Sequence, residues 1–124
     1  MSAFAHVGEL DVRMIWDGVV ARAVHADRMT MSLIELEPGA AVPEHRHGQE
    51  QVGILLVGSM TFTIGGETKT VGPGATWTIL ADVPHSVEAG ADGAVAFETF
   101  SPIRDDWHAL ERAEPTTPRW PPPA

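Results

Sequence analysis

The sequence predicts an all-β single domain, a sandwich or barrel of the jelly-roll kind. Short apolar runs recur along the chain, and almost every run ends at a turn that contains glycine or proline. Helical periodicity is nearly absent, because only residues 103–113 place apolar side chains along one side of a helix. Many short strands at turn spacing are typical of closed β architectures.

The expected strands are separated by turn sequences such as PGA at 38–40, GPG at 72–74 and DVP at 82–84. The pair Gly65-Gly66 is the strongest hairpin signal, because glycine accepts the positive φ values of a two-residue turn. In chain order, the expected strands are residues 19–24, 29–37, 51–57, 59–64, 67–71, 76–80, 85–88 and 94–100.

The C-terminal part is expected to differ from the strands before it. Residues 103–113 (IRDDWHALERA) predict a short helical segment. The last ten residues, PTTPRWPPPA, hold five prolines and predict an extended tail. We therefore assign residues 1–113 to one domain, with its central motifs at 39–89, and residues 114–124 to a Pro-rich tail.

Composition limits the possible partners. The chain has 124 residues, enough for one domain with a core, and no cysteine, which excludes disulfides and thiolate metal sites. Its net charge is −9 without a cluster of lysine and arginine, so nucleic acid and anionic membranes are poor candidates. With no long apolar run and no signal-peptide pattern, a cytoplasmic location is expected. An anionic small molecule would need a local positive centre.

The stretch EHRHGQEQ at 44–51 predicts such a centre. His45 and His47 are two residues apart on extended chain, so their side chains share a face. A turn at Gly48 can bring Gln51 beside them, and His85 follows a second turn. One histidine alone is usually an ordinary core or surface residue, but this spacing favours metal binding. Imidazole and amide ligands suit divalent Zn, Ni, Fe, Mn or Co.

These spacings resemble the two motifs of the cupin superfamily. The first, G-x5-H-x-H-x3,4-E-x6-G, fits residues 39–58 except that Gln51 stands where glutamate is usual. The second, G-x5-P-x-G-x2-H-x3-N, fits residues 74–89 more loosely. The resemblance implies a cupin barrel, also called a double-stranded β-helix. It also implies that the metal ligands are His45, His47, Gln51 and His85.

Gln51 influences which chemistry is expected. A neutral amide in place of a carboxylate leaves the cation one charge unit more positive, and therefore a stronger Lewis acid. It also disfavours the oxidised state of a redox metal. The sequence therefore favours isomerase, lyase or hydrolytic chemistry over dioxygen activation.

Strand 94–100 predicts a second group of functional residues. Ala96, Glu98 and Phe100 share one face, and if that face points into the barrel, Glu98 is a candidate proton carrier. In the alternative, Glu98 faces solvent and the other face forms the core. Arg104 either binds a substrate carboxylate or pairs with one of the two aspartates that follow it.

The runs HRHGQEQ, FTIGGETKTVGPG, DVPH and FETFSPIRDDW are similar to the KdgF family of small cupins. This resemblance implies ring opening and ketonisation of 4,5-unsaturated monouronates from pectin and alginate, which gives linear 5-keto-4-deoxyuronate. It assigns catalysis to Glu98, Phe100 and Arg104, although the family has Asp where this chain has Glu98. Arg22 and Trp77 are candidate substrate-pocket residues, with a core position as the alternative for Trp77. A homodimer is expected by the same analogy.

Two other functions stay open on the sequence. An iron-dependent dioxygenase on the same barrel would need oxygen, which an anaerobic assay under Fe(II) would reveal. A non-catalytic cupin that senses a small sugar acid would keep its binding when Glu98 is changed to glutamine. A barrel without metal is a third possibility, which elemental analysis would identify.

Overall fold

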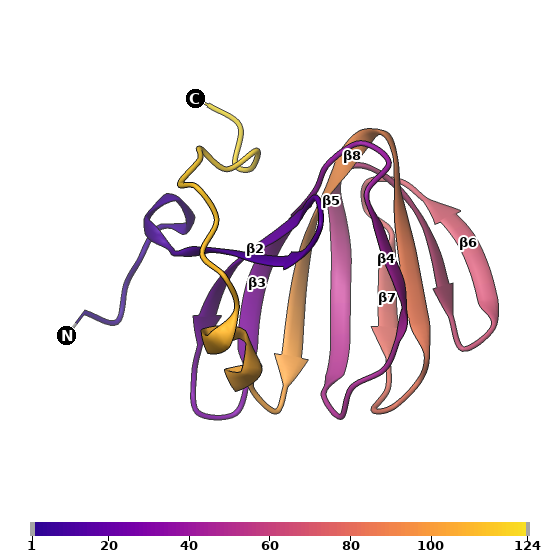
Figure 1. Cartoon of the computed structure of the whole chain (residues 1–124), viewed down its shortest axis with the longest axis horizontal. Coiled ribbons are helices and arrows are strands. Elements are labelled where there is room, and N and C mark those ends of the chain that lie inside the picture. Colours follow the sequence, from indigo (N-terminus) through magenta and orange to yellow (C-terminus); the bar gives the residue numbers. More distant parts are fainter. Residues whose placement is uncertain (1, 124) are drawn as a thin grey trace.

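The protein is described by a computed structural model that covers residues 2–123. Within this range the fold is all-β, which confirms the predicted class (Figure 1). Its strands are β1 (Val12–Trp16), β2 (Val19–His25), β3 (Thr30–Leu36), β4 (Ala41–His45), β5 (Glu50–Ile64), β6 (Glu67–Val71), β7 (Thr76–Ile79) and β8 (His85–Ser101). Two short 3₁₀ helices, η1 (Val7–Glu9) and η2 (Asp105–Ala109), complete it.

The strands form one antiparallel sheet in the order β1-β2-β3-β8-β5-β6, with β4 paired to β8 and β7 paired to β5. The long strands β5 and β8 each join two segments that the sequence predicts as separate strands, and β1 and β4 were not predicted. Register shifts at Leu55/Val57 and Gly58/Met60 bend the β5–β8 ladder. Gly58 has a φ of 83°, and a Cβ there would collide with the Gly93 backbone. The bent sheet encloses a central cavity, into which the functional side chains point.

The predicted C-terminal helix over 103–113 is wrong, since only the 3₁₀ helix η2 forms there. The reason is a competing set of backbone bonds. Met14 N donates to Glu111 O, and Ala113 N donates to Val12 O, so residues 111–113 run along β1 in extended form. A helix that continued past residue 110 would lose both of these bonds. None of the helices described in residues 2–123 is long and apolar enough to cross a membrane.

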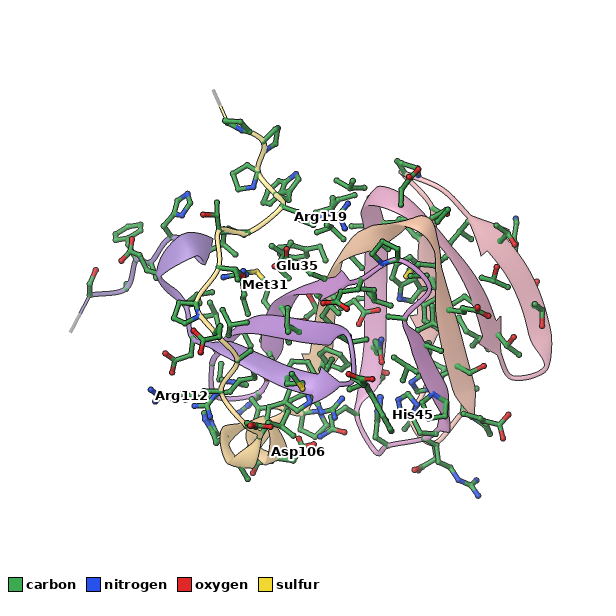
Figure 2. The ribbon with its side chains drawn as sticks, turned by 45° about the horizontal axis from the view of Figure 1, so that its top comes forward. Met31, Glu35, His45, Asp106, Arg112 and Arg119 are labelled. Carbon is green, nitrogen blue, oxygen red and sulfur yellow. The ribbon has the colours of Figure 1, made fainter. Side chains whose placement is uncertain are left out.

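The described part of the Pro-rich tail crosses β2, is hydrogen-bonded to side chains of β2 and β3, and then extends beyond the sheet (Figure 1). Arg22 of β2, whose side chain is only 1% exposed, connects the tail to β3. Its Nε donates to Glu35 Oε1 over 2.9 Å, and its Nη2 donates to Thr116 Oγ1 over 2.9 Å. Glu35 Oε2 in turn accepts from Arg119 N over 3.0 Å, and the two labelled residues lie together in Figure 2. Arg22 and Glu35 thus hold the tail to the barrel.

Arg22→Ala is expected to lower the free energy of unfolding by about 3 kcal/mol, because it leaves the part-buried Glu35 carboxylate without its guanidinium partner. Urea denaturation followed by circular dichroism measures this loss. The exposed Arg28, replaced by alanine in the same way, is the control and should change stability by less than about 0.5 kcal/mol. Equal stabilities for the two variants would contradict a structural role for Arg22.

Candidate metal centre

Three histidines come together at one end of the cavity. His45 ends β4 and His85 begins β8, and the two are directly opposite in the β4–β8 ladder. His47 lies in the turn that leads into β5. Their candidate ligand atoms all lie within 4.8 Å of one another. The structure therefore brings together the three histidines that the sequence selected.

Each of these imidazoles is held by a backbone carbonyl. Nδ1 lies 2.8 Å from Pro43 O in His45, 3.0 Å from Gln49 O in His47 and 2.9 Å from Val83 O in His85. A carbonyl oxygen only accepts hydrogen bonds, so Nδ1 carries the proton in all three rings. Nε2 is then unprotonated and free to bind a metal. Fixing the tautomer in this way is typical of metal-binding histidines.

Burial keeps two of these rings neutral. It lowers the pKa of His85 from 6.5 to about 4, because a charged imidazolium would lose its hydration. Burial, and after it the positive charge of Arg104, also lowers the pKa of His47. Since a metal binds only the neutral imidazole, both shifts favour the ligand form at neutral pH.

Gln51, on β5, provides the fourth predicted ligand. Its side chain is 5% exposed, and its Oε1 atom is buried without a hydrogen-bond partner among the described residues. Leaving a buried carbonyl oxygen unpaired costs about 1–3 kcal/mol. A cation bound to Oε1 and the three imidazoles would satisfy that oxygen, so the donor set fits a divalent metal. The neighbouring Glu50 is exposed.

The cavity beside the ligands has a volume of about 250 Å³. Besides the four candidate ligands, its polar lining groups are Glu98, Arg104 and Asp106. The rest of the wall is apolar and includes Ile34, Leu36 and Met60. The cavity wall therefore combines the four candidate ligands with three ionisable side chains and a mainly apolar remainder.

Glu98 is the acid of this site. The structure places Ala96, Glu98 and Phe100 on the wall of the cavity, so the acid faces inward. Glu98 is 6% exposed, and its Oε1 accepts a hydrogen bond of 2.8 Å from Trp77 Nε1. Burial raises the pKa of Glu98 to about 7, whereas hydrogen bonds from Gln51 and Trp77 lower it. Such a group can accept or release a proton near neutral pH.

Arg104 pairs with Asp106, the second of the two arrangements that the sequence left open, and binding of a substrate carboxylate stays a prediction. It lines the cavity, and its Nε and Nη2 atoms donate to the two carboxylate oxygens of Asp106, each over 3.1 Å. Its guanidinium lies 5.0 Å from the ring centre of Phe100 and 4.7 Å from that of Trp107. Figure 2 shows Asp106 and His45 at the same end of the molecule. Arg104 is thus held at the cavity by an ion pair and two aromatic rings.

The cupin domain family matches residues 32–100, more than half of the chain. The chain belongs to the cupin family. This cupin is 27% identical over 93 residues to the pectin degradation protein KdgF of Dickeya dadantii (strain 3937), a match that covers 73% of the chain and 84% of KdgF. It is therefore a distant homologue of KdgF.

Two solved structures show the same fold. An RmlC-like cupin from Shewanella frigidimarina NCIMB 400 superposes with a TM-score of 0.78 at 21% identity, over 86% of this cupin and 96% of that chain. KdgF from Halomonas sp. superposes with a TM-score of 0.77 at 22% identity, over 86% and 98%.

Two residues that the sequence suggested for the substrate pocket do not line the cavity of this cupin. Arg22 points to the outer side of the sheet, where it holds the tail, because the residues of β2 alternate between the two faces. Trp77 is a buried aromatic residue that packs on Phe62 at 5.2 Å between ring centres. It contacts the cavity only through its hydrogen bond to Glu98.

Two tryptophans of the cavity were not predicted from the sequence. Trp16 lies 5.6 Å from His45 between ring centres, but it is on β1, which was not predicted as a strand. Trp107 is 5% exposed and packs against Phe100 at 5.1 Å. Its signal was present in FSPIRDDW, where it was assigned to the predicted helix.

Proposed function

We propose that this cupin is a metal-dependent enzyme that opens the ring of 4,5-unsaturated monouronates and converts them to linear 5-keto-4-deoxyuronate. The observation that carries the proposal is the buried carboxyl group of Glu98 in the cavity that holds three histidines and Gln51. Distant homology to KdgF, named for pectin degradation, supports the substrate class. The four candidate ligands are all neutral, so a bound cation would keep its full positive charge and attract the small anionic substrate.

The reaction is an isomerisation, so it needs no oxidant. The anomeric hydroxyl loses a proton, the bond between the anomeric carbon and the ring oxygen breaks, and an aldehyde and an enol result. The enol then loses its proton while C4 gains one, which gives the ketone. Glu98, which lines the cavity, would move a proton in either step. A divalent cation held by the four ligands would supply a Lewis acid toward the substrate oxygens.

The remaining residues would bind and orient the substrate. Arg104 presents a guanidinium to the cavity, where a substrate carboxylate can replace Asp106 as its partner, since Asp106 has a 57% exposed side chain and can turn into solvent. Phe100 offers an apolar surface to the sugar ring. Arg104 and Phe100 would position the substrate and would not themselves gain or lose a proton.

Arg104→Ala is expected to raise KM for the uronate about 10–100-fold with a smaller effect on kcat, because a charge-assisted hydrogen bond contributes about 1.5–3 kcal/mol. Steady-state kinetics measures both constants. Arg112→Ala is the control, since this side chain is 69% exposed and pairs with Asp11 outside the cavity. An unchanged KM in Arg104→Ala would contradict carboxylate binding by Arg104.

The direct test of the function uses unsaturated monouronate generated by a polysaccharide lyase. Loss of its conjugated ultraviolet absorbance is followed with the metal-loaded protein and without protein. The proposal predicts a clear acceleration over the spontaneous rate. No acceleration with metal bound would eliminate the uronate as substrate.

The apolar wall of the cavity favours a second candidate, an iron-dependent dioxygenase with a less polar substrate. Apart from the candidate metal ligands and the ionisable side chains of Glu98, Arg104 and Asp106, few lining side chains can form hydrogen bonds with sugar hydroxyls. Oxygen consumption by the Fe(II)-loaded protein would support this candidate. Uronate conversion at full rate under anaerobic conditions would exclude a dioxygenase mechanism for the uronate reaction.

The homodimer expected by family analogy is also a proposal. Light scattering coupled to gel filtration tests it, with the mass of two chains as the predicted result and the mass of one as the contrary result.

A further inference from the structure

Three residues on neighbouring strands form a row that ends at Glu98 on the wall of the cavity. Gly53 on β5 is directly opposite Trp77 on β7 and Glu98 on β8. Residues opposite one another in a sheet point to the same face. Gly53 has no side chain, and the indole of Trp77 lies across it to reach Glu98 Oε1.

Glycine is required at this position. A Cβ atom on Gly53 would lie 2.5 Å from both Nε1 and Cε2 of Trp77, closer than such atoms can approach. Glycine within a strand often marks a place where another group approaches the backbone closely. The backbone angles of Gly53 do not demand glycine, since its φ is not among the positive values. Its role is therefore to make room for the indole.

Glu98 connects this row to the metal ligands. Gln51 lies two residues before Gly53 on β5, and Gly53 is directly opposite Glu98, so the side chains of Gln51 and Glu98 point to the same face as diagonal neighbours. Both line the cavity, where the amide N–H₂ group can donate to the Glu98 carboxyl group. The other end of the amide, Oε1, is the buried atom without a partner.

We propose that Trp77, lying across Gly53, fixes the carboxyl group of Glu98, and that Glu98 fixes the Gln51 amide with its oxygen toward the cation. Trp77 and Gly53 are then positioning residues for the metal centre. Without this chain of contacts the amide could turn over and present N–H₂, which cannot bind a metal. The inference rests on the metal centre of the proposed function and is independent of the substrate.

Metal affinity is the first readout, measured with Co²⁺ in competition with a chromophoric chelator. Trp77→Phe keeps an aromatic ring but removes the N–H, and Gly53→Ala displaces the indole. Each is expected to weaken Co²⁺ binding about tenfold or more, the typical loss when a group that orients a ligand is removed. Because both changes act on the same contact, the double variant should bind no more than about threefold more weakly than either single variant.

Two matched variants control for packing and stability. Trp120→Phe changes a tryptophan of the tail, and Gly72→Ala adds a Cβ at a position with nothing within 4 Å. Both should bind Co²⁺ like the wild type. Affinities of Trp77→Phe and Gly53→Ala within twofold of the wild type, in folded protein, would overturn the inference.

A second readout does not depend on metal. In ¹H–¹⁵N spectra, the indole N–H resonance of Trp77, assigned by its absence in Trp77→Phe, should move upfield in both Gly53→Ala and Glu98→Ala. An unchanged resonance would overturn the contact itself. If the wild type binds no metal while this resonance does move, the metal centre of the proposed function fails and the contact between Trp77 and Glu98 stands.

Discussion

His85→Ala is expected to lower the affinity for divalent metal by more than about 100-fold, because removing a group that merely orients a ligand already costs 10–100-fold. His85 is 4% exposed and held at Nδ1 by the Val83 carbonyl, so its imidazole is fixed in place before a metal binds. After dialysis of the metal-loaded protein, elemental analysis should find close to one metal per chain in the wild type and almost none in the variant.

The control for this prediction is another histidine. His6 is exposed and caps the 3₁₀ helix η1 through its Nδ1 atom, away from the cavity. His6→Ala should retain the metal. Equal metal content in His85→Ala and His6→Ala would show that the cation is bound elsewhere or by fewer ligands.

Glu98→Gln is expected to reduce kcat for the uronate about 10²–10⁴-fold, the usual contribution of one positioned acid–base group. Glutamine has nearly the same shape but cannot carry the proton, and the three imidazoles remain. At saturating metal the variant should therefore stay loaded, and KM should change little. Steady-state kinetics and elemental analysis of the same sample measure the two properties together.

Glu88 provides a matched control on the same strand, because it is an exposed glutamate of β8. Glu88→Gln should have the wild-type kcat. Full activity in Glu98→Gln would remove Glu98 from the reaction. A wild-type protein that binds the uronate without converting it, and keeps that binding in Glu98→Gln, would favour a sensor over an enzyme.

The three-histidine cluster could be predicted because local chain geometry determines most of its arrangement. Two histidines at i and i+2 of an extended segment share a face in any strand, whatever its partners. Gln51 and His85 each follow a turn whose glycine or proline is visible in the sequence. The pattern was therefore enough to select the three histidines that the structure brings together, and Gln51 as the fourth ligand stays a prediction.

Other features depend on which strands become neighbours, and no local pattern contains that information. The contact of Trp77 with Glu98 requires β7, β5 and β8 to pair in one particular register across Gly53. The helix expected over 103–113 was wrong because the edge of β1 offers backbone partners to residues 111–113. Arg22 was expected in the substrate pocket, but it lies outside the cavity, where the docked tail provides its partner Thr116.

The most direct test of the metal centre is anomalous diffraction from crystals of the metal-loaded protein, recorded at the absorption edge of the bound metal. A centre with these four ligands should give one strong peak within about 2.0–2.2 Å of Nε2 in His45, His47 and His85 and at a similar distance from Oε1 of Gln51. A peak bound to other residues, or a Gln51 amide turned away from it, would show that the cation is held differently.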